Sequence, residues 1–322
     1  MEPLGHLADI GYRVIGPIII LTGAGYLLGR RIPATAEVLA KILLWLLIPI
    51  FVFLKILESS LQGAACGSII VFSALVFVVL WAVAWVVSRL RRHDPPLRGA
   101  FANTTILYNS ANFAIPVMDL AFSLDPAART FAVAAQAIVA TFQGMAAYTV
   151  GAFIAAAGAG PIGHAARKVL GLPFIYALAA ALALKWAGVD AEKLQKVHIF
   201  WQPAAYISQA YVPMALMTLG AQMACVRLVR APLDLALSAG LRLLAGPLLA
   251  LALVKMMGLT GLLAQVLIIG AAGPSAVAGV VVAIEFKNRP DFAASAVLLS
   301  TLGAGLTVPV VIFLVQEFIA IV

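Results

Sequence analysis

Four residues in the stretch YNSANFAIPVM (residues 108–118) are unusual for an otherwise apolar segment: Asn109, Ser110, Asn112 and Pro116. The two amides and the hydroxyl can donate hydrogen bonds to a carboxylate or another anion. Proline removes a backbone donor and ends or kinks a helix, which leaves backbone groups unpaired. In lipid such groups are tolerated only where they are buried in protein or line a cavity. The stretch therefore indicates a polar site inside an apolar protein.

A second proline-interrupted stretch, GAAGPSAVAG (residues 270–279), carries Gly273, Pro274 and Ser275. Proline suits the first turn of a helix, so we expect a new half-helix to begin after each of Pro116 and Pro274. The N-terminal end of a half-helix has free N–H groups and about half a positive charge. Two such ends directed at the centre of the protein would bind an anion. The alternative is a pair of ordinary proline kinks without a ligand.

The elements that position both stretches are membrane-spanning helices. Of the 322 residues, 64% are hydrophobic and 11% are charged, whereas soluble proteins have about 25% charged residues. Hydrophobic runs that approach or reach the roughly 20 residues of a bilayer crossing predict ten spans, at residues 14–29, 38–57, 66–90, 97–122, 127–157, 168–187, 203–224, 232–257, 261–286 and 291–319. The predicted fold class is an all-α polytopic membrane protein in which spans 4 and 9 are broken.

Basic residues indicate the orientation of these spans. The connections after the odd-numbered spans carry twelve Lys and Arg residues, and the opposite side carries seven. Since basic residues concentrate in cytoplasmic loops, we expect both termini on the outer, periplasmic side of the inner membrane. The net charge of +8 then belongs to these loops and not to a nucleic-acid partner. The expected environment is the lipid bilayer, and a homodimer stays open.

The stretch GAGPIGHAARK (residues 158–168) divides the ten spans into five and five. If the halves share a fold, an odd number of spans makes the second half enter the membrane from the opposite side, as in secondary transporters with inverted repeats. We expect a first repeat at residues 1–157, a short cytoplasmic linker at 158–167 and a second repeat at 168–322. Spans 4 and 9 occupy the same position in the two halves, so the two breaks match.

Several blocks resemble the auxin efflux carrier family, which includes plant PIN proteins and bacterial malate and malonate permeases. NSANFAIP (109–116) is similar to its N-x-G-x-x-G-[IL]-P element, and LLSTLGAGLTVP (298–309) is similar to its closing S-T-L-x-x-x-T-x-P signature. LIPIF, ALMTLGAQMA and LRLLAGP look similar to further blocks. Ala111 and Ala114 stand where the family usually has glycine, and the short connection at 158–167 is like that of the bacterial members.

The resemblance implies a five-plus-five inverted arrangement like that of bile-acid symporters and NhaA, with helices 4 and 9 crossing at the substrate site. It also implies a scaffold and a transport domain, and elevator-type alternating access. We therefore predict a secondary active transporter of a small organic anion, a mono- or dicarboxylate. A sodium-coupled symporter of the bile-acid type and a non-coupled uniporter are the alternatives. The expected substrate-binding residues are Asn109, Ser110, Asn112, Ile115, Pro116, Gly273, Pro274 and Ser275.

Four further polar residues within the spans are candidates for coupling or for lining the cavity. Asp119, on the first turn of the expected half-helix, is a stabilising acid or a carrier of a proton or cation. Arg242 snorkels to the cytoplasm, pairs with Asp234 or Asp119, or contacts the substrate. Gln136 and Gln143 share one helix face, where they hydrogen-bond neighbouring helices or line the cavity. No cofactor is expected, and coupling to H+ or Na+ stays open.

The sequence gives little support for an enzyme or a channel. It has no H-E-x-x-H zinc motif, no G-x-S-x-G nucleophile elbow and no pair of mid-span aspartates in a G-x-G-D setting. Cys66 and Cys225 lie in or beside apolar segments and fit packing, so we expect neither a metal site nor a catalytic residue. A channel would need filter loops or rings of charge, and a pseudo-symmetric single chain fits a carrier better.

Overall fold

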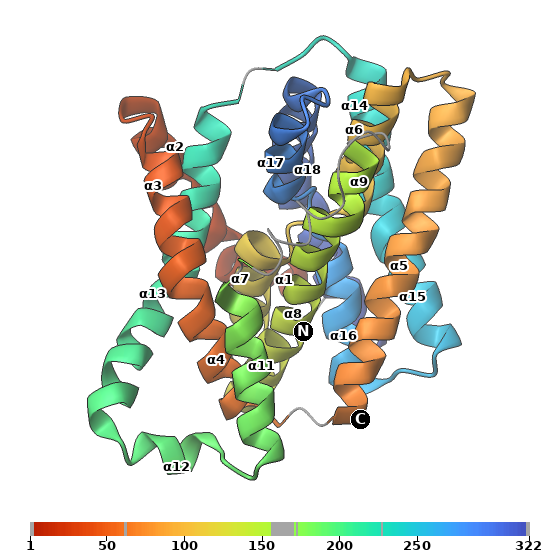
Figure 1. Ribbon diagram of the computed structural model, residues 1–322. Coiled ribbons are helices and arrows are strands. Elements are labelled where there is room, and N and C mark those ends of the chain that lie inside the picture. The colour runs from red at the N-terminus through yellow and green to blue at the C-terminus, as the bar shows by residue number, and fades with distance from the viewer. Residues whose placement is uncertain (1–2, 61–62, 156–170, 172, 227, 320–322) are drawn as a thin grey trace.

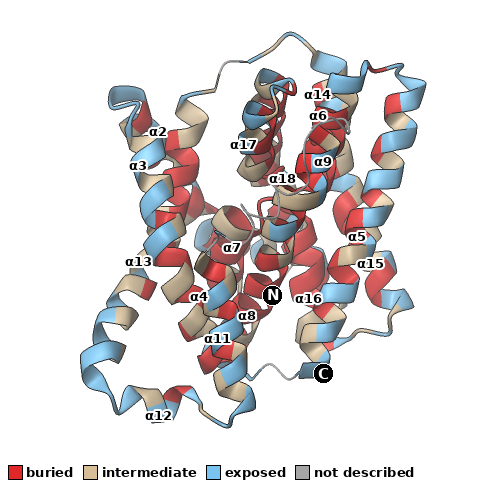
Figure 2. Ribbon diagram, viewed as in Figure 1, coloured by how far each residue is buried: buried red, intermediate tan, exposed pale blue. Residues whose placement is uncertain are grey.

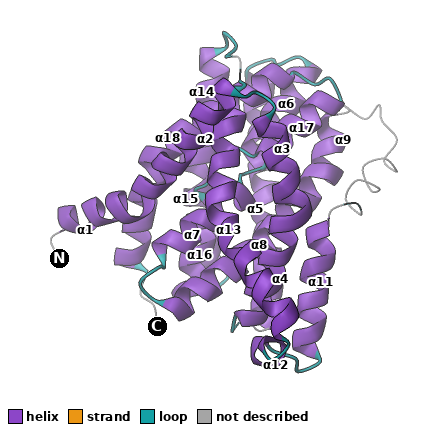
Figure 3. Ribbon diagram, turned by 90° about the vertical axis from the view of Figure 1, so that its left-hand side faces the viewer, coloured by secondary structure: helices purple, strands orange, loops and turns teal. Residues whose placement is uncertain are grey.

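The computed structural model describes residues 3–60, 63–155, 171, 173–226 and 228–319, and every regular element among them is a helix (Figure 3). We write η for a π-helical segment. α1 (Pro3–Ile10) lies before the first predicted span, which contains the end of η1 (Gly11–Ile15) and most of α2 (Gly16–Arg31). The next four spans correspond to α3 (Thr35–Ile42), η2 (Leu43–Leu47) and α4 (Ile48–Glu58), then α5 (Gly63–Leu90), then α6 (Pro95–Ile106), η3 (Ser110–Ala114) and α7 (Ile115–Ala121), and finally α8 (Pro126–Ala146), η4 (Ala147–Gly151) and α9 (Ala152–Ala155).

The second five predicted spans are also helical where the structure describes them. They contain α11 (Pro173–Trp186), followed by the short α12 (Ala191–Gln195), then α13 (His198–Ala224), then α14 (Pro232–Gly240), η5 (Leu241–Ala245) and α15 (Gly246–Met256), then α16 (Gly261–Ala271) and α17 (Val277–Glu285), and finally α18 (Pro290–Phe318). The predicted linker at 158–167 lies outside the described residues, so the boundary between the two halves stays a prediction.

Six helical runs in the described residues are long and apolar enough to cross a membrane: Gly5–Arg31, Thr35–Glu58, Gly63–Leu90, Pro126–Ala155, Pro232–Met256 and Pro290–Phe318. The remaining predicted spans are the two broken ones, the short apolar α11 and the less apolar α13. The all-α membrane class is thereby confirmed. The inverted relation between the two halves stays a prediction.

The helices form two groups that pack mainly within themselves (Figure 1). In the first group, α13 packs along α2, α3 and α4, and α11 packs along α4. In the second group, α5 contacts α6, α8 and α15, while α18 contacts α6, α14, α16 and α17. The groups meet where η3 contacts α13, where α4 contacts α8, and where η1 contacts α7 and α18. Both broken spans belong to the second group and lie at its centre.

Burial follows this arrangement (Figure 2). Every residue of α6 from Gly99 to Ile106 is buried, and so is every residue of α16 from Ala264 to Ala271. In α5, by contrast, apolar side chains such as Val78, Trp81 and Trp85 are exposed. An apolar outer surface is what contact with lipid requires. The half-helices that lead to the two breaks are therefore the innermost elements of the protein.

Glycines bring α2 and α13 into backbone contact inside the first group. A Cβ atom added at Gly220 would lie 1.9 Å from the carbonyl oxygen of Thr22, and one added at Gly25 would lie 2.0 Å from that of Met217. Small residues allow such close approach of helices in membranes. The spacing of Gly25 and Gly29, four residues apart on one face of α2, supplies the sequence signal for this contact.

Replacing Gly220 with alanine should therefore destabilise the protein, because the obstructing atoms belong to backbone and cannot rotate away. We expect a loss of about 1–3 kcal/mol or more from overpacking, although alanine is the better helix former. Gly23→Ala on α2 is the matched control, since its added Cβ would meet nothing within 4 Å. Melting temperatures in detergent compare the two variants, and equal stability would contradict the contact.

An ion pair joins the N-terminal end of the first broken span to the C-terminal end of the second. Asp94 caps the start of α6 by accepting a hydrogen bond from the Leu97 N–H (2.9 Å), and the guanidinium of Arg289, which lies between α17 and α18, donates to its second oxygen. The backbone hydrogen bond from Leu97, followed by the bond from Arg289, lowers the pKa of Asp94 below its ordinary value. The beginning of the first broken span is thus fixed to the end of the second.

Candidate functional site

The two broken spans cross and are hydrogen-bonded to each other at their breaks. Residues 107–109 follow α6, and residues 272–276 follow α16. The Asn109 N–H donates to the Pro274 carbonyl (2.7 Å), and the Ala276 N–H donates to the Leu107 carbonyl (2.9 Å). These bonds form an isolated antiparallel β-bridge between Tyr108 and Ser275, which we call the crossing bridge. Each break thereby pairs backbone groups of the other, as buried backbone in a membrane requires.

The first break does not lie at Pro116, as the sequence predicted, but ends seven residues earlier at Asn109. Pro116 is instead the second residue of α7, directly after π-helical η3, in which the Ala114 N–H donates to the Asn109 carbonyl (3.0 Å). In the second span the prediction is nearer, because Pro274 lies in the break itself and α17 begins at Val277.

The π-helical turns explain why proline does not break three further helical runs. Three more prolines occupy the same place, the second residue of an α-helix that follows a five-residue π segment: Pro17, Pro49 and Pro247. In each case the residue before proline donates to a carbonyl five residues back instead of four. This wider turn does not need the N–H group that proline lacks, and it relieves the clash that proline causes in an α-helix. Four described prolines thus follow a π segment, whereas Pro274 lies in a break.

Arg242 neutralises the C-terminal ends of the two half-helices that lead into the crossing. It lies in η5, is fully buried, and donates to the Thr105 carbonyl (3.1 Å) of α6 and to the Ala271 carbonyl of α16. Its guanidinium carbon lies 4.8 Å from the centre of the Tyr108 ring. The C-terminal end of a helix carries partial negative charge, so these two ends need a cation or donors. Arg242 supplies both.

The expected partners of Arg242 are engaged elsewhere. Asp234 accepts hydrogen bonds from Arg91 and His93, both at 3.1 Å. Asp119 pairs with the guanidinium of Arg129 through two bonds of 2.8 and 2.6 Å. Pairing of Arg242 with either acid, or its snorkelling to the cytoplasm, is therefore wrong. Since the second half-helix begins at Ser110, Asp119 also does not lie on its first turn.

A cavity of about 220 Å3 opens beside the crossing, between the two helix groups. It is lined by the first turns of both second half-helices, by α8, and by η2, α11 and α13 of the first group. Its lining residues are Ala40, Leu43, Leu44, Ile48, Tyr108, Asn109, Ser110, Ala111, Asn112, Ala140, Gln143, Gly144, Tyr148, Phe174, Gln222, Ala276, Val277, Ala278 and Val281. None of them is charged. We call this space the crossing cavity.

Two buried amides in the crossing cavity have a free nitrogen. The Asn109 side-chain oxygen accepts from the Asn112 N–H (3.1 Å), and the Gln143 side-chain oxygen accepts from the Tyr108 N–H (3.4 Å). Backbone N–H groups can only donate, so they fix which end of each amide is the oxygen. The nitrogens of Asn109 and Gln143 are buried and have no partner among the described residues. Two donors therefore remain for a ligand.

The other predicted site residues lie in or behind the crossing. Ser275 is fully buried, its hydroxyl donates to the Thr104 carbonyl (2.6 Å), and its N–H donates to the Ser300 hydroxyl oxygen (3.0 Å). Gln136 donates to the Ser110 carbonyl (3.1 Å). Of the two glutamines, only Gln143 lines the crossing cavity. The residues of the predicted set that do not line it are Ile115, Pro116, Gly273, Pro274 and Ser275.

The sequence did not indicate most of the crossing-cavity wall. Leu43, Leu44, Tyr148 and Phe174 are ordinary residues of apolar helices, and no local pattern separates them from lipid-facing neighbours. Gln222 carried a signal, as an amide within a predicted span, and its side-chain oxygen is also without a partner among the described residues. Polarity inside a span is thus the one feature by which a lining residue could be found beforehand.

A comparison with protein families adds a finding for the second half of the chain. A family model described as "Membrane transport protein" matches residues 163–312. The matched range contains Arg242 and the second break, and it lies outside the first broken span. No curated protein matches the chain in a sequence search.

Proposed function

Because residues 163–312 belong to the membrane transport protein family, that of the auxin efflux carriers, we propose that this multi-pass membrane transporter is a secondary active carrier of a small organic anion. The proposed cargo is a mono- or dicarboxylate, bound in the crossing cavity. One observation carries this proposal: the first turns of two half-helices and two unpartnered amide nitrogens meet in one uncharged cavity.

The free backbone groups that the N-terminal ends of the two second half-helices bring to this cavity are donors. Val277 and Ala278 are the first two residues of α17, whose N–H groups have no partner inside the helix. The helical run from Ser110 to Ala121 presents its N-terminal end to the same space. A carboxylate only accepts hydrogen bonds and is favoured by the partial positive charge of helix N-termini. A small carboxylate therefore complements this lining better than a cation does.

The position of the crossing cavity between the two helix groups supports alternating access. Residues of η2 and α13 come from the first group, and those of η3, α8 and α17 come from the second. We propose that the first group is the scaffold and that the second group carries the substrate across by an elevator motion. With both termini on the periplasmic side of the inner membrane, the cavity lies toward the cytoplasm, because α17 and the C-terminal end of α13 lead to odd-numbered connections.

Arg242 weighs against the alternative of a sodium-coupled symporter of the bile-acid type. In transporters with broken helices, carbonyls at the C-terminal ends of half-helices coordinate the coupling Na+. Here the carbonyls of Thr105 and Ala271 accept hydrogen bonds from Arg242. A permanent cation already occupies the position that a coupling ion would take at the crossing. Coupling to H+ and non-coupled uniport both remain compatible with this arrangement.

A thermal-shift screen of the purified protein against mono- and dicarboxylates, in Na+ and in choline buffers, tests the proposal. We expect a small carboxylate to raise the melting temperature equally in both buffers. Asn112→Ala should weaken this ligand roughly tenfold, because it removes one hydrogen bond to a charged group, and should leave the protein folded. Gln209→Ala, an exposed amide on α13 outside the cavity, is the control. Unchanged affinity in Asn112→Ala would contradict the assignment.

A further inference from the structure

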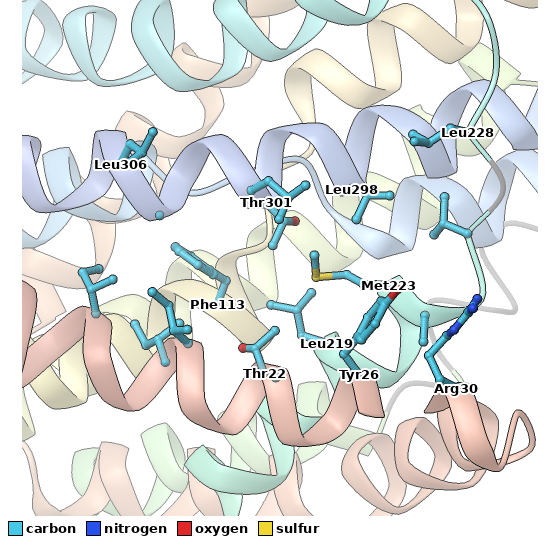
Figure 4. A pocket seen from close by; sticks show the side chains of 18 residues that line it. Thr22, Tyr26, Arg30, Phe113, Leu219, Met223, Leu228, Leu298, Thr301 and Leu306 are labelled. Carbon is cyan, nitrogen blue, oxygen red and sulfur yellow. The ribbon is translucent and has the colours of Figure 1, made fainter. Parts of the chain in front are cut away.

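A second and larger cavity lies on the opposite side of η3 from the crossing cavity. It is a groove of about 760 Å3 between α2 and the end of α13 on one side and α18 on the other. Figure 4 shows Arg30 at one end of this groove and Leu306 toward the other. Ile15 of η1 and Arg30 of α2 both line it, and at 1.5 Å per residue they are separated by about 22 Å. We call it the α2–α18 groove.

The lining of the α2–α18 groove is mostly apolar, with the hydroxyl groups of Thr22 and Thr301 near its middle (Figure 4). Its side chains are mainly Ile, Leu, Met and Val, and several that lie at its rim, such as Ile19, Leu302 and Leu306, are exposed. Among the described residues that line it, Arg30, in the last turn of α2, is the one that is charged. Arg30 forms no hydrogen bond or ion pair with any described residue. The groove thus combines a long apolar wall with an unpaired cation at its end.

The apolar wall and the cation at its end indicate which kind of molecule binds in the α2–α18 groove. A long apolar groove open along its rim to the membrane takes a hydrocarbon chain, because burying apolar surface there is favourable. An unpaired guanidinium at the membrane surface favours a phosphate, with which arginine forms bidentate hydrogen bonds. Anionic lipids are further attracted to basic residues at the ends of spans. We propose that the α2–α18 groove binds one anionic phospholipid of the bilayer, with an acyl chain along α2 and α18 and the phosphate at Arg30.

This lipid lies between the two helix groups and reaches the back of the crossing. Phe113 of η3 lines the α2–α18 groove and is nearly fully buried, while its neighbour Asn112 lines the crossing cavity. At the other wall, Gln222 of α13 lines the crossing cavity and Met223 lines the groove. The acyl chain therefore fills the space that separates α18 from α2 and packs behind the segment that carries the site.

Native mass spectrometry of the full chain in detergent, titrated with phosphatidylglycerol or with zwitterionic phosphatidylcholine, tests the proposal. We expect one phosphatidylglycerol to bind more tightly than phosphatidylcholine. Arg30→Gln should weaken phosphatidylglycerol about fivefold, which corresponds to roughly 1 kcal/mol per basic residue. Arg31→Gln, the adjacent exposed arginine outside the groove, should leave binding unchanged.

A second experiment fills the α2–α18 groove with a larger side chain. A Cβ added at Gly305 would meet nothing within 4 Å, so the side chain in Gly305→Leu projects into the α2–α18 groove and should abolish tight binding of phosphatidylglycerol. Gly67→Leu on α5, which is equally unobstructed and lies elsewhere, is the control. Equal binding of both lipids, unchanged binding in Arg30→Gln or Gly305→Leu, or a dimer of this chain in place of bound lipid would overturn the proposal. None of these readouts depends on the transported substrate.

Discussion

Replacing Arg242 with glutamine is expected to abolish transport and to lower the melting temperature of the purified protein by roughly 5–10 °C. The substitution removes donors from the buried carbonyls of Thr105 and Ala271, and each unsatisfied group costs about 1–3 kcal/mol. At about 2–4 °C per kcal/mol, the lower end of this cost, summed over both carbonyls, gives a shift of this size. It also removes the cation that contacts the negative ends of α6 and α16, so the crossing loses the charge that holds these ends together.

Two further variants make this result specific to the position of the charge. Arg242→Lys keeps a cation that can reach one carbonyl but not both, because ammonium lacks the planar fork of guanidinium, and should give an intermediate loss. Arg230→Gln removes an exposed arginine from the connection before α14 and should change neither quantity. Uptake into proteoliposomes and melting curves measure both effects. If Arg242→Gln transported at the wild-type rate, the role of Arg242 at the crossing would have to be abandoned.

Replacing Asn109 with aspartate is expected to reduce uptake of the organic anion by about 100-fold with little loss of stability. The aspartate oxygen can still accept from the Asn112 N–H, so the cap of η3 is preserved. The free amide nitrogen, however, becomes a second carboxylate oxygen beside the ligand. A lost charge-assisted hydrogen bond costs about 1.5–3 kcal/mol, and like-charge repulsion adds to it.

Asn109→Ser separates the two effects, because it keeps a capping oxygen without adding a charge. We expect this variant to transport at a rate between wild type and Asn109→Asp, with melting temperatures close together in all three. The affinities of the three proteins for a carboxylate that stabilises the wild type provide the measurement. Equal affinity in Asn109→Asp and wild type would show that the Asn109 amide nitrogen does not face the anion.

How far the sequence predicted the site depends on whether a residue carries a polar signal of its own. Asn109, Asn112 and Gln143 are polar within apolar runs, and the structure places all three on the crossing cavity. The position of the first break was wrong by seven residues because a π segment accommodates Pro116, and π-helical turns have no sequence signature apart from the proline itself. The partners of Arg242 could not be predicted, since they are backbone carbonyls of distant helices.

Two contacts, one between side chains and one between spans, were not predicted. Asp119 and Arg129 lie at the two ends of the short connection between α7 and α8, so their ion pair could have been inferred from chain proximity. The predicted spans coincide with helical segments where the structure describes them, because hydrophobic length is set by the bilayer, and six of the described helical runs are long and apolar enough to cross it. The crossing bridge could not be predicted from either span alone, because it joins residues 108 and 275, which only the assembled fold brings together.

The crossing bridge has a mechanical consequence. Its two backbone hydrogen bonds join the segments around Tyr108 and Ser275. Arg242 donates to carbonyls of both α6 and α16. Asp94, at the start of α6, pairs with Arg289, which follows α17. Two helical spans joined at three points cannot rotate against each other about their crossing. In the proposed elevator motion, a substrate bound against Asn109 and Val277 would therefore move together with both broken spans as one rigid body, past a wall formed by η2 and α13.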